Sequence, residues 1–194
     1  LDGDGHLDLY LSNFICWNLG RYYVDNIYHN NGDGTFADWT GLNGFGDAKR
    51  AGRGVAPADA DGDGDVDLLI NNYRLHANTY FSNLGDGTFE DIGRENGLAG
   101  DPTFVGSTRY YGHTIGAAWG DLDNDGDLDV VESNLAHPRY FEFSNKTMIL
   151  MNDGAGQWTD NQGEWLLPAG DAGLRYQETH SVPVLAAFDH DGNL

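Results

Sequence analysis

The stretch GDLDNDGDLDV, residues 120–130, contains five aspartates that alternate with other residues from Asp121 to Asp129. A glycine, Gly126, stands at the sixth position counted from Asp121. Carboxylates this close together repel one another, so the loop needs a compensating positive charge. The pattern therefore indicates a cation-binding loop.

The same pattern recurs along the chain. Residues 59–67 read DADGDGDVD, residues 1–8 read LDGDGHLD without the first aspartate, and residues 188–194 read FDHDGNL without the last. Asp59 and Asp121 are 62 residues apart, and the other copies fall at similar intervals. We therefore expect a fragment of a longer repeat protein, with repeats at approximately 1–52, 53–112 and 113–180 and the start of a fourth at 181–194.

A second motif has the same period. NNGDGTFAD (30–38), NLGDGTFED (83–91) and NDGAGQWTD (152–160) align without gaps, and each reads as two strands joined by a glycine turn. Strand-like runs also precede and follow each acidic loop, as in LDVVESN (128–134). Four short strands per repeat predict an all-β fold, a β-propeller fragment of about three four-stranded blades.

Composition supports this class. The chain has 194 residues, 28 glycines, 31 acidic residues and a formal net charge of −21. Such acidity argues against binding to nucleic acid or to anionic membranes. A hydrophobic content of 40% is too high for a disordered tail, and the single cysteine excludes an internal disulfide. No apolar run is long enough to span a membrane, and no signal peptide is visible in a chain that starts at Leu1.

The acidic loops have the residue types that Ca²⁺ requires. Aspartates at positions 1, 3, 5 and 9 offer hard oxygens, the glycine at position 6 allows a tight wrap, and position 7 would add a backbone carbonyl. A soft metal does not suit carboxylates, and Mg²⁺ prefers fewer protein ligands. A solvated acidic turn is the alternative, against which the four phased copies argue. The candidate ligands are Asp2, Asp4, His6 and Asp8; Asp59, Asp61, Asp63, Asp65 and Asp67; Asp121, Asp123, Asp125, Asp127 and Asp129; and Asp189, Asp191 and Asn193.

An EF-hand is the rival calcium motif. Glu132 is twelfth from Asp121, where an EF-hand has its bidentate glutamate. Leu11 and Ile70 hold that position in other copies, and the flanking residues alternate with the period of a strand. We therefore predict that position 9 closes the site and that a strand follows.

The D-x-D-x-D-G-x-x-D loop before a strand resembles the FG-GAP/VCBS repeats of integrin α-subunit propellers. NNGDGTFADWTGLNG and NLGDGTFEDIGRENGL look closer still to the cartilage acidic protein (ASPIC/UnbV) family. The resemblance covers essentially the whole chain and implies a calcium-stabilised, secreted β-propeller. It carries the calcium ligands onto the aspartates of 59–67 and 121–129. The first copy lacks position 1, the fourth has Ala187 there, and the cysteine-containing C-terminal modules of the family are absent.

Ligand binding is predicted at the end of the blades opposite the calcium loops. In an antiparallel blade, the calcium loops and the GDGTF turns share one end, and the remaining connections share the other. Those connections hold all ten basic residues and many aromatic ones. The candidate ligand or partner residues are Trp17, Arg21, Tyr23, Arg109, Tyr110, His113, Arg139, Tyr140 and His180.

The sequence allows three functions, of which the first is the prediction and the other two are alternatives. The first is a non-catalytic, calcium-stabilised extracellular binding or adhesion module for a protein or glycan ligand. The second is a glycan-active propeller enzyme, a lyase or hydrolase, that uses histidine, arginine and tyrosine of the loop face. The third is a structural subunit of an extracellular assembly, since three blades cannot close a ring and their edge strands need the missing blades or partner subunits.

Overall fold

The structure is a computed structural model that describes residues 1–16, 18–46, 49–135, 139, 144–158, 174 and 180–186. Within these residues the chain is all-β: every element is a strand and none is a helix. The strands are β1 (Leu9–Leu11), β2 (Ile15–Cys16), β3 (Arg21–Tyr22), β4 (Asn26–Asn30), β5 (Phe36–Asp38), β6 (Gly52–Ala58), β7 (Asp67–Asn72), β8 (Thr79–Asn83), β9 (Phe89–Asp91), β10 (Thr103–Val105), β11 (Thr108–Tyr110), β12 (Thr114–Gly120), β13 (Asp129–Asn134) and β14 (Met148–Leu150).

The middle sheet is a complete four-stranded blade. Its strands pair antiparallel in the order β6-β7-β8-β9, so each strand lies beside its neighbours in sequence. Ala58 at the end of β6 pairs with Asp67 at the start of β7, which places the acidic loop 59–67 directly between them. The turn from β8 to β9 lies at the same end of the sheet. The connection 73–78, from β7 to β8, lies at the opposite end.

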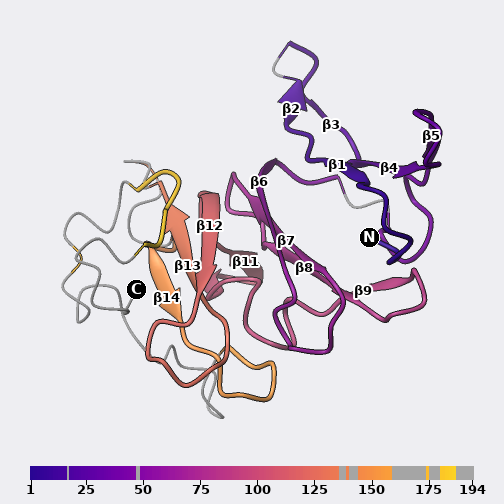
Figure 1. The fold of residues 1–194 in the computed structure, drawn as a ribbon. Coiled ribbons are helices and arrows are strands. Elements are labelled where there is room, and N and C mark those ends of the chain that lie inside the picture. The colour runs from indigo at the N-terminus through magenta and orange to yellow at the C-terminus, as the bar shows by residue number, and fades with distance from the viewer. Residues whose placement is uncertain are drawn as a thin grey trace.

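The other two large sheets repeat this arrangement. They have the orders β1-β4-β5 and β12-β13-β14, and Figure 1 shows the β6–β9 sheet between them. The strands β12 and β13 flank the loop 121–129 as β6 and β7 flank the loop 59–67. Two small hairpins, β2-β3 and β10-β11, form in connections that we expected to be loops. Their strands are rich in aromatic and β-branched residues, which favour extended backbone.

Apolar side chains pack between neighbouring sheets in two clusters. One joins the β6–β9 sheet to β13 and β14 through Leu69, Tyr80, Leu98, Val130 and Trp158. The other joins it to β4 through Ile27, Phe45, Leu68, Phe81 and Phe89. The indole Nε1–H of Trp119 also donates to the backbone oxygen of Ala56 at 3.1 Å, from β12 to β6. The sheets are therefore packed face to face, as blades of a propeller are.

The segment after each blade helps to close the core of the next. Phe45 stacks on Phe89 with ring centroids 4.4 Å apart, and the N–H of Phe89 donates to the backbone oxygen of Asn43 at 2.8 Å. In the same way, the N–H of Trp158 donates to the backbone oxygen of Asn96 at 2.8 Å. The linkers 41–46 and 93–98 therefore act as inter-blade contacts as well as connections.

The predicted fold class is confirmed: the described chain is an all-β propeller fragment. The exact repeat boundaries, 1–52, 53–112 and 113–180, stay predictions. The fourth acidic loop, with Asp189, Asp191 and Asn193, lies outside the described residues, as do Trp17 and Tyr140. No helix that could cross a membrane was found among the residues that the structure describes.

Candidate functional site

The acidic loops share one backbone shape. The φ angle is positive at the fourth and sixth positions of all three described copies: 73° and 88° at Gly3 and Gly5, 75° and 100° at Gly62 and Gly64, and 62° and 102° at Asn124 and Gly126. Glycine adopts this region without steric cost, and asparagine tolerates it better than most residues. In each loop, two or three of the carboxylates lie close together.

The second loop, 59–67, gathers three carboxylates. One oxygen each of Asp59, Asp61 and Asp63 lies within 4.8 Å of the others. Oδ1 of Asp59 is buried and accepts no hydrogen bond from any described residue. Burial, together with the charges of Asp67, Asp63 and Asp59, raises the pKa of Asp61. A hard divalent cation would relieve this repulsion and satisfy the buried oxygen.

The third loop, 121–129, gathers Asp121, Asp123 and Asp129 within the same 4.8 Å. The backbone N–H groups of Asp125 and Gly126 each donate to one oxygen of Asp121 at 3.1 Å, which fixes its carboxylate. The carboxylate of Asp125 accepts the N–H of Asp127 at 3.0 Å and is not one of the three gathered groups. Three carboxylate oxygens of this loop are therefore already close enough together to bind one cation.

The aspartate at position 9 joins each acidic loop to the end of the third strand of its blade, which is β4, β8 or β14. Oδ1 of Asp8, Asp67 and Asp129 accepts the backbone N–H of Asn30, Asn83 and Asn152, respectively, at 2.8, 2.9 and 2.8 Å. Oδ2 accepts from the backbone nitrogen at position 2, which belongs to Leu1, Ala60 and Leu122, at 2.6, 3.0 and 2.8 Å. Asp67 and Asp129 are almost fully buried, and that burial raises the pKa of both carboxyls.

The three asparagines complete this contact and were missed by the sequence analysis. The side-chain Nδ2 of Asn30, Asn83 and Asn152 donates to the position 8 oxygen of Leu7, Val66 and Leu128, at 3.0, 3.2 and 3.3 Å. Their Oδ1 atoms accept the N–H of the first turn glycine, Gly32, Gly85 or Gly154. The sequence did contain a sign of their importance, because each asparagine is the first residue of a copy of the aligned hairpin motif.

The side chain at position 7 lies against the same hairpin turn. A methyl group at Gly85 would lie 2.8 Å from Oδ2 of Asp65, and one at Gly154 would lie 2.8 Å from Oδ2 of Asp127. His6 contacts Gly32 in the first copy. These side chains occupy the space between the acidic loop and the hairpin. That the backbone oxygens at position 7 bind a cation stays a prediction.

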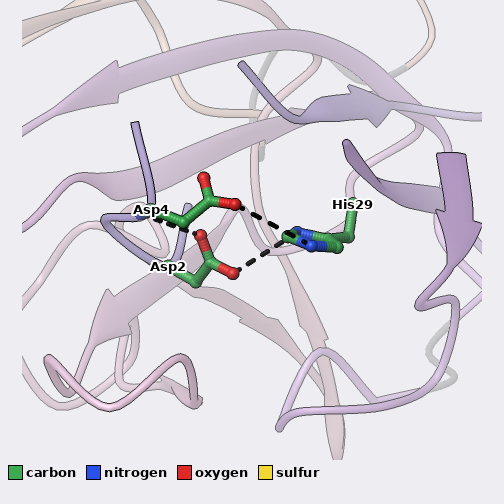
Figure 2. Close-up of side chains that lie close together, drawn as sticks. All are labelled: Asp2, Asp4 and His29. Atoms are coloured by element: carbon green, nitrogen blue, oxygen red, sulfur yellow. Dashed lines mark hydrogen bonds and ion pairs between the residues drawn. The ribbon is translucent and has the colours of Figure 1, made fainter. Parts of the chain in front are cut away.

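The first loop includes a histidine that the sequence analysis did not single out. The carboxylates of Asp2 and Asp4 lie beside the imidazole ring of His29, a residue of β4. One ligand atom of each of the three side chains lies within 4.8 Å of the others (Figure 2). Nδ1 of His29 is 3.3 Å from Oδ2 of Asp2 and 3.2 Å from Oδ1 of Asp8. The ring stacks on Trp39 at 4.4 Å. The aligned residues in the other copies are Ser82 and Met151, so this donor is specific to the first loop.

Glu132 does not serve the loop as an EF-hand glutamate would. It lies in β13, is fully buried, and its Oε2 accepts from Nδ2 of Asn78 at 2.9 Å. This bond joins β13 to the connection between β7 and β8. Burial raises the pKa of Glu132 to about 8. The rejection of the EF-hand agrees with the strands on both sides of the loop.

The predicted ligand residues that the structure describes lie in or beside connections at the ends of the blades away from the acidic loops. Arg21 is in β3 and Tyr23 follows it, Arg109 and Tyr110 are in β11, His113 precedes β12, and Arg139 is between β13 and β14. Their common role in ligand binding stays a prediction. At the same end, Arg53 packs over Phe14, with its guanidinium carbon 4.0 Å from the ring centroid, and over Tyr73 at 5.3 Å.

Two of the predicted ligand residues, His113 and His180, make structural contacts. His113 is 3% exposed, its ring packs on Tyr73 at 4.4 Å, and its Nδ1 accepts the N–H of Arg74 at 3.1 Å. Nδ1 of His180 lies 2.8 Å from Oγ1 of Thr147. Each therefore helps to hold a connection in place.

Comparison with known proteins agrees with the repeated loops. The family model for FG-GAP-like repeats matches residues 1–70 and 59–132. The chain is 36% identical over 170 residues to cartilage acidic protein 1 of Mus musculus and 34% identical over 170 residues to that of Homo sapiens, which is 87% of this chain in both cases. The chain spans about a quarter of the length of these relatives, 24% and 23%. The sequence motifs, the sheets and the family match together show that this chain belongs to the FG-GAP-like repeat family.

Proposed function

We propose that this chain is a calcium-stabilised interaction module of an extracellular protein. The observation that carries the proposal is the loop geometry: three acidic loops with one backbone shape each gather ligand atoms within 4.8 Å. The position 9 aspartate then joins each loop to its hairpin. A cation held in the loop would therefore stabilise the contact between the second and third strands of each blade.

The donors fit Ca²⁺ better than other metals. Asp59, Asp61 and Asp63 offer only carboxylate oxygens, as do Asp121, Asp123 and Asp129. Ca²⁺ favours many flexible oxygen ligands, whereas transition metals favour sulfur or imidazole. The first loop differs because His29 faces it, and we propose that residues 1–8 bind calcium more weakly.

An extracellular location agrees with this chemistry. Extracellular modules bind Ca²⁺ with dissociation constants of about 10⁻⁴–10⁻³ M, which is suited to the calcium concentration outside cells. The matched relatives are named cartilage acidic protein 1, a name that refers to an extracellular tissue. We therefore place this chain in a secreted or cell-surface protein.

The proposed interaction face is the end of the blades opposite the acidic loops. Nine basic residues in the described part of the chain lie in connections or strand ends there, while the loop carboxylates lie at the other end. Arginine and aromatic residues are enriched in protein interfaces. The role proposed is binding without turnover, and His113 and His180 each make a hydrogen bond that helps to hold a connection in place.

Calorimetric titration of the metal-free chain with CaCl₂ tests the metal assignment. We expect one site in each complete loop, with dissociation constants of about 10⁻⁴–10⁻³ M. Asp61→Asn and Asp123→Asn should each remove one site. Glu90→Gln, which changes an exposed acid outside the loops, should keep both. Absence of binding heat, or an unchanged site number in the loop variants, would refute the proposal.

A further inference from the structure

A pocket of about 280 Å³ at the end opposite the acidic loops is lined by basic side chains. Its lining residues are Lys49, Arg50, Leu75, His76, Ala77, Arg94, Arg109 and Tyr111. Four of the ten lysines and arginines of the chain therefore meet at one place, in a protein whose net charge is −21. Repulsion among these cations is a cost that a bound anion would offset.

The pocket is built from separate connections that hydrogen bonds hold together. The N–H of Leu75 donates to the backbone oxygen of Gly112 at 2.9 Å, and the N–H of Tyr111 donates to that of Leu75 at 3.1 Å. The N–H of Asn78 donates to the backbone oxygen of Ala99 at 3.0 Å. These bonds fix the connection 73–78 against the segments on both sides of β10-β11, so the walls of the pocket are set by the fold.

Arg50 is the cation of the pocket whose position is fixed by contacts with the protein. Its guanidinium donates to the backbone oxygens of Ala77 and Asn78 at 3.4 and 3.3 Å and to Oγ1 of Thr79, and it pairs with Asp91 at 3.3 Å. Burial, followed by the charges of Arg50 and Arg74, lowers the pKa of the adjacent His76. Burial is the main cause of this lowered pKa, and the two arginine charges add to it.

The other three cations are available to a ligand. Lys49, Arg94 and Arg109 are exposed, and no carboxylate of the described residues lies within 4.0 Å of their nitrogens. Lysine and arginine side chains only donate hydrogen bonds. The matching group therefore only accepts them, which describes a carboxylate, a sulfate or a phosphate. Nδ1 of His76 is already used as the acceptor of the Ala51 N–H at 3.2 Å.

We propose that this pocket binds a single oxyanion group, a carboxylate, sulfate or phosphate, carried by the ligand of the interaction face. The inference rests on the proposed binding role and names the chemistry that this role recognises. A long polyanion fits less well, because a chain with 31 acidic residues repels charge beyond the pocket. A small anion in the pocket lies within about one Debye length of the cations, which is ~8 Å at physiological salt, so their attraction is not screened away.

Nuclear magnetic resonance titration of the calcium-loaded chain tests the inference. The probes are sulfate, phenyl phosphate and glutarate, added separately at low ionic strength. We expect shifts at the amides of Leu75–Ala77 and Arg109–Tyr111, with dissociation constants of ~1–10 mM that weaken as NaCl is added. The probe that binds most tightly identifies which oxyanion the pocket prefers.

Two variants and a matched control locate the binding. Arg94→Ala should weaken the best probe about tenfold, the effect of losing one charge-assisted hydrogen bond, and Arg94→Ala with Arg109→Ala should remove binding. Arg53→Gln removes an exposed arginine charge at the same end; Arg53 packs over Phe14 and does not line the pocket, so this variant should leave the affinity within about twofold. If the double variant binds the best probe with the same affinity as the parent, the inference is wrong.

The same samples separate this inference from the proposed calcium role. If the chain keeps a calcium-dependent melting temperature but none of the three probes binds, the pocket assignment is wrong and the calcium role stands. If the melting temperature does not respond to calcium while the probes bind as expected, the calcium role is wrong and the pocket assignment stands.

Discussion

At the scale of single residues, the aspartate at position 9 has a different task from the other loop aspartates. Asp67 accepts three hydrogen bonds, from the N–H groups of Ala60 and Asn83 and from the hydroxyl of Tyr80. Asp59 and Asp61, at positions 1 and 3, instead turn their oxygens toward one another, and Asp129 does both, because it also lies with Asp121 and Asp123. Position 9 therefore contributes hydrogen bonds to folding with or without a cation, while we expect positions 1 and 3 to depend on the proposed cation.

Replacing Asp67 tests this division. Asp67→Asn places an amide group against backbone N–H donors, so we expect the free energy of unfolding to fall by about 1–3 kcal/mol in saturating calcium. Urea denaturation monitored by circular dichroism measures the change. Glu90→Gln, at an exposed position in β9, should stay within about 0.5 kcal/mol of the parent. Equal stability of the two variants would contradict the anchoring role.

Glu132 predicts a pH dependence of stability. Its pKa is about 8 in the folded chain, above the usual 4.5, so the folded state holds the proton more tightly than the unfolded state does. Stability from this group is therefore fully present below pH 4.5 and is lost as the pH rises toward 8. Glu132→Gln keeps an oxygen for Asn78 and should be more stable than the parent by about 3 kcal/mol at pH 7.

The difference between variant and parent should vanish near pH 4.5, since both side chains are then neutral. Chemical denaturation at pH 5, 6, 7 and 8 follows the difference, and comparison with the parent cancels the titration of the loop carboxylates. A difference that stays constant over this range would show that Glu132 is not held neutral by burial.

At the scale of elements, the linkers between blades are part of the core. A methyl group at Gly44 would collide with the backbone carbonyl of Phe89, and φ at this glycine is 85°. Gly46 has a similar φ of 65° but no atom within 4 Å of such a group. Both alanine variants lose the freedom of glycine, at about 1 kcal/mol, but only Gly44→Ala also pushes two blades apart.

We therefore expect Gly44→Ala to lower the free energy of unfolding by at least about 1 kcal/mol more than Gly46→Ala does. Thermal denaturation of the pair measures this difference directly, because the two variants share their intrinsic backbone penalty. Similar losses in the two variants would mean that the linker can move away from β9 at little cost.

The elements also show what could be predicted from sequence. The strands around 59–67 and 121–129 follow from alternation and turn glycines, and these were correct. The contacts of Asp8, Asp67 and Asp129 with Asn30, Asn83 and Asn152 span 22, 16 and 23 residues. This spacing varies with the intervening connection, so the hairpin motif identifies each asparagine but not the aspartate that it contacts. His29 joins the first loop across β4 for the same reason, and the basic pocket requires several connections to be placed in space.

At the scale of the whole molecule, charge is divided between two ends. The three described acidic loops hold 13 of the 31 acidic residues, and the described basic residues lie in connections or near strand ends at the other end. Calcium bound as proposed at one end would lower the repulsion that the compact fold must overcome, whereas the proposed ligand would use the cations of the other end. We therefore expect substitutions to change the two proposed functions separately.

The melting temperature in EDTA and in 10 mM CaCl₂ tests the central claim most directly. If each complete loop binds with a dissociation constant of ~10⁻⁴ M, calcium should stabilise the chain by about 2.7 kcal/mol per loop, which corresponds to a rise of roughly 10 °C or more for both loops. Asp61→Asn and Asp123→Asn together should remove most of this rise. An identical melting temperature with and without calcium would show that the acidic loops are solvated turns and would contradict the account.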